Sequence, residues 1–234
     1  MLRIYYADGF KGFLTACAKL VRKPFQPLQF QLIKATDMQL GIFRNGIDDA
    51  DIIRANERMV RKFTRQLVDC ISDKFYESLD RAFRHNSPEK ETYCYHAIRL
   101  GLDYGASVIQ FKQDIKIARF LKMAEEVNLE IQRFCSGENF NKHNRLKIFL
   151  AVITTKYDIL DVLARYFQIR LNWTPWMILT QKQMATWDGE QLTIKELHQP
   201  RNGDSQIDIE KLWAGRKTGD RSQPISGALN CGLL

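Results

Sequence analysis

The chain has 234 residues, of which 45% are hydrophobic and 26% are charged, and its formal net charge is +8 with a pI near 9.3. This composition is typical of a folded globular protein and excludes a disordered chain. No apolar run reaches the roughly 18 residues that a membrane span needs, and the first residues lack a secretion signal, so we expect a cytoplasmic protein without membrane contact.

The cysteines are widely separated and form no C-x-x-C pair; they are Cys17, Cys70, Cys94, Cys135 and Cys231. Disulfide frameworks and metal sites in small domains use closely spaced cysteines. We therefore expect reduced, mostly buried thiols, no bound metal and no cofactor.

Residues 1–48 predict a small αβ unit. A short strand leads through the turn residues Asp8 and Gly9 into an amphipathic helix. Residues 28–33 then alternate as a half-buried strand, which we expect to pair with residues 39–43.

Residues 49–135 predict a helical region, interrupted at residues 84–91. There Ser87 suits a helix cap and Pro88 the first helical position, and the helix that follows should end near Gly105. We expect a core stripe on each of the last two helices, formed by Tyr93, Ala97, Leu100 and Tyr104 and by Ile117, Leu121, Ala124, Val127 and Ile131.

Residues 136–198 predict a second αβ module. Residues 146–154 are apolar enough for a central strand, and residues 158–171 form an amphipathic helix that Asp158 should cap. An antiparallel hairpin follows, from strands at 176–180, 183–187 and 191–194 with a turn at Asp188 and Gly189. The remainder, 199–234, reads as a mostly flexible tail with a short amphipathic stretch at 207–213, and the whole chain as a helix-rich α+β fold.

The stretch "RANERMVRKFTRQ" at 54–66 contains an unusual concentration of cations. Projected as one helix over residues 50–67, its apolar residues gather on one side and its basic residues, Arg54, Arg58, Arg61, Lys62 and Arg65, on the other. A solvated helix face would be better served by mixed charges, because like charges at this spacing repel one another. A polyanion-binding face is the alternative, and we favour it.

Other polar and aromatic residues offer weaker candidates. Lys112, Lys116, Arg119 and Lys122 form a second basic cluster, which nearby acidic residues dilute, and we interpret it as solvated surface. Four single polar residues are also candidates: His143, Glu130, Arg133 and Asp188. The presence of each is explained by an ordinary role in a loop, an ion pair or a turn. The last three would form a functional cluster if the fold brought them together. Trp173, Trp176 and Trp187 suit either a core or a platform for a flipped base.

The order of several short stretches resembles a bacterial DNA metabolism protein family. Its domain of unknown function also occurs fused to some uracil-DNA glycosylases, and its genes often lie beside one for a radical SAM protein. The matching stretches are "YYADGFKGFLTA" (5–16), "RLGLDYG" (99–105), "EIQRF" (130–134), "YDILDVLARYF" (157–167), "WMIL" (176–179), "WDGE" (187–190) and "IEKLW" (209–213).

The chain also departs from the family pattern at three places. Gln132 and Tyr166 stand where the family has histidines, which removes two potential acid-base or ligand groups. Residues 214–234 do not resemble the segment that usually follows the last tryptophan.

Three functions from different classes remain open at this point. The resemblance and the basic residues favour a DNA-binding accessory protein of DNA metabolism or repair. The alternatives are a scaffold that docks a radical SAM partner and a divergent nucleic-acid-processing enzyme, which would need Glu130, Arg133 or Asp188 in one pocket. No stretch of the sequence specifies a reaction.

Overall fold

The computed structural model describes residues 2–22, 30–35, 52–137, 140–197 and 209–215. The chain divides into two compact units, of which the first contains residues 1–130 with 156–158 and the second contains residues 131–155 with 159–234. The helix-rich α+β fold predicted from the sequence is confirmed. The N-terminal αβ segment and most of the helical region fall within one unit.

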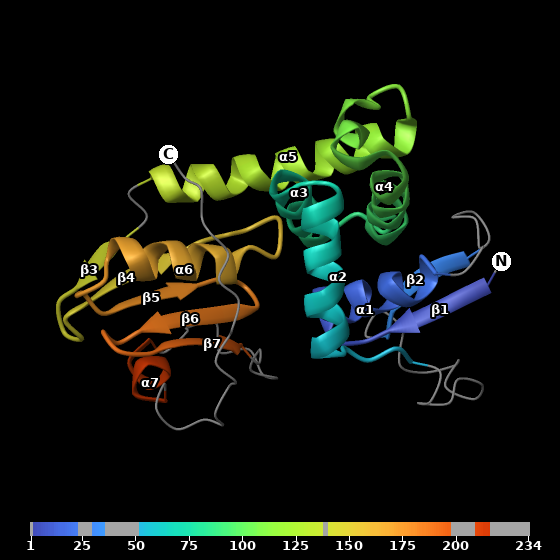
Figure 1. The fold of residues 1–234 in the computed structure, drawn as a ribbon. Coiled ribbons are helices and arrows are strands. Elements are labelled where there is room, and N and C mark those ends of the chain that lie inside the picture. The colour runs from blue at the N-terminus through green and yellow to red at the C-terminus, as the bar shows by residue number, and fades with distance from the viewer. Residues whose placement is uncertain (1, 23–29, 36–51, 138–139, 198–208, 216–234) are drawn as a thin grey trace. The chain divides into compact units, whose positions relative to one another are not determined.

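The first unit opens with a strand, a helix and a second strand (Figure 1). They are β1 (Leu2–Tyr6), α1 (Gly9–Leu20) and β2 (Phe30–Lys34). Strand β2 pairs with β1 in parallel, with Ile4 opposite Leu32. The predicted strand, turn and helix are thus confirmed, whereas the expected partner segment 39–43 lies outside the described residues.

The turn between β1 and α1 requires unusual backbone angles and a close approach. Asp8 and Gly9 have φ values of 62° and 60°, the left-handed region that glycine and aspartate tolerate better than most residues. At Gly12, an added Cβ would lie 1.5 Å from the carbonyl oxygen of Ala7. Only glycine lets α1 pack this closely against the end of β1.

The helices that follow in the first unit are α2 (Glu57–Cys70), α3 (Asp73–Arg84), α4 (Lys90–Tyr104), the 3₁₀ segment η4 (Gly105–Gln110) and α5 (Ile115–Ser136), whose last turns belong to the second unit. The predicted helix start at Pro88 is two residues early, because the Ser87 hydroxyl accepts the Glu89 N–H in a turn and α4 begins afterwards. Gly105, with φ of 63°, ends α4 as predicted.

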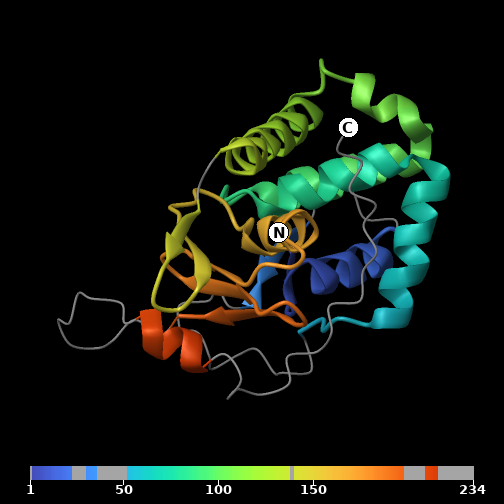
Figure 2. The same cartoon turned by 90° about the vertical axis from the view of Figure 1, so that its left-hand side faces the viewer.

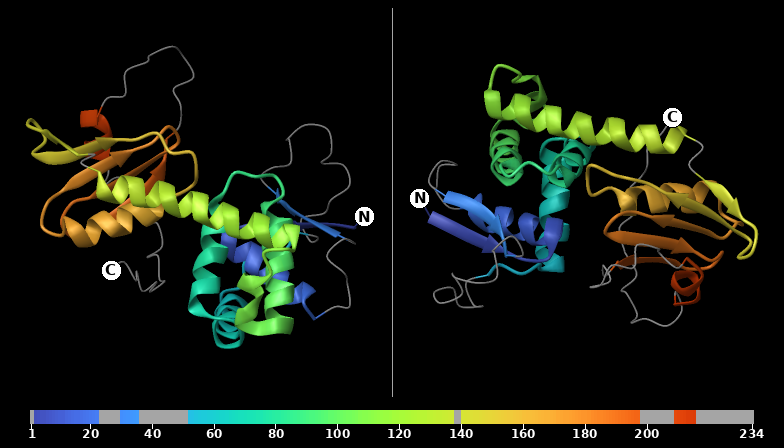
Figure 3. Two further views of the ribbon diagram at one scale, coloured as in Figure 1. Left: turned by 90° about the horizontal axis from the view of Figure 1, so that it is seen from above. Right: turned by 180° about the vertical axis from the view of Figure 1, so that it is seen from behind.

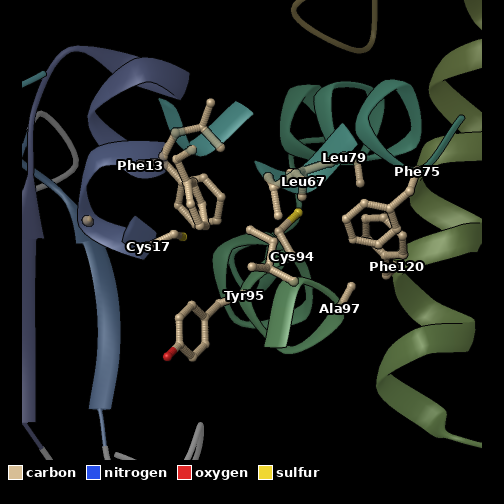
Figure 4. Close-up of a cluster of buried hydrophobic side chains, with 14 of the residues drawn as sticks. Phe13, Cys17, Leu67, Phe75, Leu79, Cys94, Tyr95, Ala97 and Phe120 are labelled. Carbon is tan, nitrogen blue, oxygen red and sulfur yellow. The ribbon is translucent and has the colours of Figure 1, made fainter. Parts of the chain in front are cut away.

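Buried side chains from the helices of the first unit form its core (Figure 4). Phe13, Leu67, Phe75, Ala97 and Phe120 are each at most 3% exposed. Burying a leucine or phenylalanine side chain stabilises the folded state by roughly 1.5–3 kcal/mol. Cys17 and Cys94 lie in the same core, where burial raises the pKa of both thiols well above the usual range.

The predicted stripe on α5 is largely buried, but the stripe predicted on α4 is partly wrong. Tyr104 is 58% exposed, and its ring contacts Phe111 edge-on at 5.3 Å instead of entering the core. The buried residues of α4 include Cys94, Ile98 and Gly101. The buried face is therefore rotated from the predicted one, because α4 packs against both α2 and α3.

The second unit is a five-stranded sheet with helices (Figure 2). Its elements are β3 (Asn141–His143), β4 (Ile148–Val152), α6 (Leu160–Arg170), β5 (Trp176–Leu179), β6 (Gln183–Trp187), β7 (Leu192–Glu196) and α7 (Ile209–Ala214). The strands lie in chain order, and only β4 and β5 are parallel among these pairs, with α6 connecting them. Figure 3 shows α6 and α7 on opposite faces of this sheet.

Strand β5 explains why "WMIL" is apolar throughout, since both of its faces are buried. Met177 and Leu179 pack with Trp213 of α7, and Trp176 contacts Phe140, which in turn contacts Phe167 of α6. The predicted strands and the hairpin between β6 and β7 are confirmed.

Residues 156–158 belong to the first unit through specific contacts. The Tyr157 hydroxyl donates to Glu126 at 3.0 Å, and Arg84 donates to the Asp158 carbonyl oxygen at 3.0 Å. The predicted capping role of Asp158 is wrong, because α6 begins at Leu160 and its N-cap residue, Ile159, provides no side-chain cap. Contacts with Arg84 hold the Asp158 backbone instead.

Candidate nucleic-acid interface

The start of α2 is fixed by the segment before it, which is extended rather than helical. Ile53 forms a parallel bridge with Tyr6, and its N–H donates to the Tyr5 carbonyl oxygen at 2.9 Å. The Ala55 N–H donates to the Asp8 carboxylate at 2.9 Å. The prediction of one helix over residues 50–67 is therefore wrong at its beginning: hydrogen bonds to the end of β1 and the turn after it compete with helix formation.

Asn56 caps the helix that follows. Its side-chain oxygen accepts the Met59 N–H at 2.9 Å, which satisfies one of the donors that every helix N-terminus leaves unpaired. Its own N–H donates to the hydroxyl of Thr15, which is 1% exposed. These bonds fix the rotation of α2 about its axis relative to α1.

The inward face of α2 consists of Val60, Phe63 and Leu67, all buried. On the opposite side, Arg58, Arg61, Lys62 and Arg65 are all exposed. They occupy positions i, i+3, i+4 and i+7 and so share a sector of about 100° on the helix surface. We call these four residues the basic face.

Arg54 does not belong to this face, which corrects its predicted position on the helix. It is exposed, but it lies in the extended segment before Asn56. Its place is fixed by the pairing of Ile53 with Tyr6 and not by helical spacing.

In the described parts of the chain, no carboxylate forms an ion pair with a residue of the basic face. The positive charge of the face is therefore not neutralised by such pairs. Glu57, one turn before Arg61, pairs instead with Lys11 of α1 at 2.6 Å. Arg61 donates only to the Glu57 carbonyl oxygen, at 3.4 Å. Asp69 is an exposed acid that follows Arg65 by one turn and projects in a similar direction.

A pocket of about 260 Å³ adjoins the basic face. It lies between the end of α1, α2 and α4, and Lys62 is common to the face and to the pocket wall. Arg22 and Arg99 add two more cations to the wall, and Asp103 adds one carboxylate. The basic face thus continues into a recess and is not an isolated stripe.

In the second basic cluster, Lys112 precedes α5, whereas Lys116, Arg119 and Lys122 lie along its first turns, and three of the four line a shallow hollow. Asp114 was expected to reduce the positive charge of this cluster. Its carboxylate instead pairs with His96 at 2.9 Å and accepts hydrogen bonds from the backbone N–H groups of Lys116 and Ile117. Partial burial opposes ionisation, but these bonds outweigh it and lower the pKa of Asp114.

Two further acids, Glu125 and Glu126, were expected to dilute the cluster; Glu125 is exposed, whereas Glu126 has specific partners. It accepts hydrogen bonds from Tyr157 and pairs with His85 at 3.1 Å, and these bonds, with His85 first, lower the pKa of its carboxyl. Its distance to Lys122 is 3.9 Å. Asp114 is therefore engaged away from the lysine and arginine side chains of the cluster, whereas Glu126 still pairs with one of them.

The other predicted site residues have local partners. The Glu130 carboxylate accepts the Lys156 N–H at 2.6 Å, the Arg133 guanidinium lies 4.7 Å from the Phe134 ring centre, and Asp188 accepts two N–H groups of its hairpin turn. Glu130 belongs to the first unit, whereas Arg133 and Asp188 belong to the second. Each of these contacts is local to a helix end or a turn.

The tryptophans divide between the core and the surface. Trp176 and Trp187 are buried in the second unit, and the Trp187 indole donates to the Asn172 carbonyl oxygen at 3.0 Å. Trp173 is 91% exposed. Two of the three are therefore core residues and leave no platform of three rings.

The described ranges contain neither a cluster of metal ligands nor a membrane-spanning helix. No group of three or more His, Cys, Asp or Glu side chains there is placed to hold a metal ion. Among the helices of the same ranges, none is long and apolar enough to cross a membrane. Cys231 lies outside them.

A family model described as a domain of unknown function, DUF4130, matches residues 88–215, more than half of the chain. The chain belongs to this family. No curated protein and no solved structure matches it. The DUF4130 segment runs from the turn before α4 to the end of α7 and includes Arg99 and Asp103 of the pocket, whereas the basic face precedes it.

Sequence reasoning missed the cap at Asn56 and the pocket beside the DUF4130 segment. The cap carries a sequence signal, because asparagine directly before a charged first turn is a favoured N-cap. The pocket carries none, since Arg22, Lys62 and Arg99 are far apart in the sequence and only the packing of three helices brings them together.

Proposed function

We propose that this protein is a DNA-binding accessory protein of DNA metabolism or repair, acting in the cytoplasm, and that it holds duplex DNA through the basic face of α2. The main support for this proposal is that α2 is buried on one side and exposes four cations on the other: Arg58, Arg61, Lys62 and Arg65. Such an arrangement can release several phosphate counterions at once, which is the main source of affinity for a nucleic-acid backbone.

The dimensions of the face support duplex DNA as its ligand. Arg65 lies seven positions after Arg58, which corresponds to about 10 Å along the helix axis. The major groove is about 12 Å wide and admits one helix. Long arginine side chains from such a helix reach phosphates at the groove edges, and these contacts carry no base information, so binding should be largely independent of sequence.

The resemblance of the chain to a DNA metabolism family agrees with this proposal, as does its net charge of +8. A radical SAM protein is the partner that the resemblance implies. An alternative use of the basic face is to dock an acidic surface of that partner, and the experiment below distinguishes the two.

The test is a titration of a labelled duplex with the wild-type protein and with a variant in which the four residues of the basic face are glutamine. We expect the variant to lose at least about tenfold in affinity at low salt, since each lost phosphate contact weakens binding. A matched control replaces Lys112, Lys116, Arg119 and Lys122 with glutamine, which removes the same charge from the start of α5 and the turn before it. Equal losses in both variants would show a general charge effect, and no loss in the first would favour protein docking.

A further inference from the structure

The pocket beside the basic face combines three cations with an apolar wall. Arg22, Lys62 and Arg99 supply the positive charges, and Asp103 supplies the carboxylate. The rest of the wall is mostly apolar and includes Met59 and Phe63. A volume of about 260 Å³ accommodates a phosphate group with part of a sugar, and is near the lower end of the range for small-molecule sites.

Arg99 is held in place by the helix that it caps. One of its guanidinium nitrogens donates to the Val21 carbonyl oxygen at 3.0 Å, at the C-terminal end of α1. A guanidinium has five N–H donors, so this bond leaves others for a ligand while it restricts the side chain. Such restriction reduces the entropy that is lost when an anion binds.

The charge of the pocket distinguishes two kinds of phosphate. The three cations and Asp103 give a formal charge of +2. A phosphate monoester carries about −1.5 to −2 at neutral pH, whereas a phosphodiester within a strand carries −1. A recess between three helices also suits a group at the end of a chain, because an internal phosphodiester has nucleotides on both sides.

We propose that this pocket binds the terminal phosphate monoester of a nucleic-acid strand whose backbone lies on the basic face. This inference rests on the proposed function, since Lys62 serves both. The phosphate contacts Arg22, Lys62 and Arg99, and the apolar wall receives the terminal sugar. Asp103 lowers the affinity for the dianion and so favours release.

The test compares three DNA ligands of one sequence: a closed circular duplex, a linear duplex with terminal phosphates and a linear duplex with terminal hydroxyls. Both 5′- and 3′-phosphorylated forms are used. We expect the wild-type protein to bind one phosphorylated form about tenfold more tightly than the hydroxyl form, the scale of a few charge-assisted hydrogen bonds. Free nucleoside monophosphate, as a competitor, should bind more weakly than the phosphorylated strand end.

Two variants locate this preference in the pocket. Arg22→Gln should reduce the preference to twofold or less, and Asp103→Asn should increase it; the preference is the ratio of affinities for the two kinds of end, so a general charge effect, read from the circular duplex, cancels from it. Arg99 is not substituted, because its loss would also remove the bond to α1. Equal binding of phosphate and hydroxyl ends by the wild type, or a preference that Arg22→Gln leaves intact, would overturn the inference. Tighter binding of the free nucleotide would overturn its assignment to a strand end.

The circular duplex separates this inference from the proposed function. If the circular duplex binds and the two kinds of linear end are equivalent, only the pocket assignment fails. If the circular duplex does not bind while phosphorylated ends do, the backbone-binding role of the basic face fails instead.

Discussion

The Glu57 carboxylate lies 2.6 Å from the ammonium group of Lys11, so the acid at the start of α2 pairs with α1 and not with the arginine one turn later. This pair is about half exposed on both sides, and such pairs add at most about 1 kcal/mol to stability. Its main consequence is electrostatic, because Lys11 offsets the negative charge of Glu57 beside the basic face.

Replacing Glu57 with glutamine should therefore strengthen DNA binding. The change removes a negative charge next to Arg58 and Arg61 and leaves Lys11 unpaired with it, so we expect affinity for a duplex to rise by about twofold to fivefold at low salt and less at high salt. Fluorescence anisotropy at two salt concentrations measures the effect. Glu77→Gln is the matched control, since Glu77 is an exposed acid on a different helix, α3. An equal rise in both variants would assign the effect to net charge.

The capping bond at Asn56 should contribute measurably to stability. Asn56→Ala removes the acceptor of the Met59 N–H, and the loss of such a cap typically costs about 1 kcal/mol. Asn56→Asp and Asn56→Ser should retain most of the stability, because both side chains can accept the same bond. Urea denaturation of the three variants measures this, and similar losses in all three would show that the cap is not the cause.

The two buried tryptophans of the second unit should respond differently to replacement by phenylalanine. The Trp187 indole donates to Asn172, whereas the indole nitrogen of Trp176 has no hydrogen-bond partner within the described structure. Trp187→Phe loses a bond and strands a carbonyl oxygen, so we expect it to destabilise the protein by about 1 kcal/mol more than Trp176→Phe. Chemical denaturation of both variants checks the difference. Equal costs would show that packing volume alone decides.

Acid should weaken the protein partly through Asp114. Hydrogen bonds and His96 lower the pKa of Asp114 in the folded state, so its contribution is present above the unfolded pKa of about 3.9 and is lost as the pH falls through the lowered folded value. Asp114→Asn should destabilise the protein at neutral pH and reduce the dependence of its stability on pH below about 4. Denaturation at pH 7 and at pH 3 measures both, and an unchanged pH dependence would contradict this role.

The sequence predicted the α+β class and the strand and hairpin elements because these depend on local apolar patterns. Residues 176–179 illustrate this, since a continuous apolar run between turns required a strand buried on both faces. The helix over 50–67 was predicted too long for the opposite reason. Helical periodicity continued through Arg54, but the pairing of Ile53 with Tyr6 is a contact between distant residues that no local pattern contains.

The candidate site could be predicted only in part, because only some of its residues lie close together in the sequence. The four cations of the basic face share one helix, so their spacing placed them together. The pocket needed α1, α2 and α4 to pack, and Arg99 to bind the end of α1, before its three cations could meet. The sequence alone could not show whether Glu130, Arg133 and Asp188 form a functional cluster. The structure adds that each of them has a local contact, which no sequence pattern predicts.

The central claim is that the basic face contacts DNA phosphates, and the salt dependence of duplex binding tests it most directly. If all four cations contact phosphates, the logarithm of the affinity should fall against the logarithm of the salt concentration with a slope of about −3.6. Arg58→Gln combined with Arg61→Gln should reduce the steepness of that slope by about 2, with little change in thermal stability because both side chains are exposed. An unchanged slope in this double variant, with the fold intact, would contradict the account.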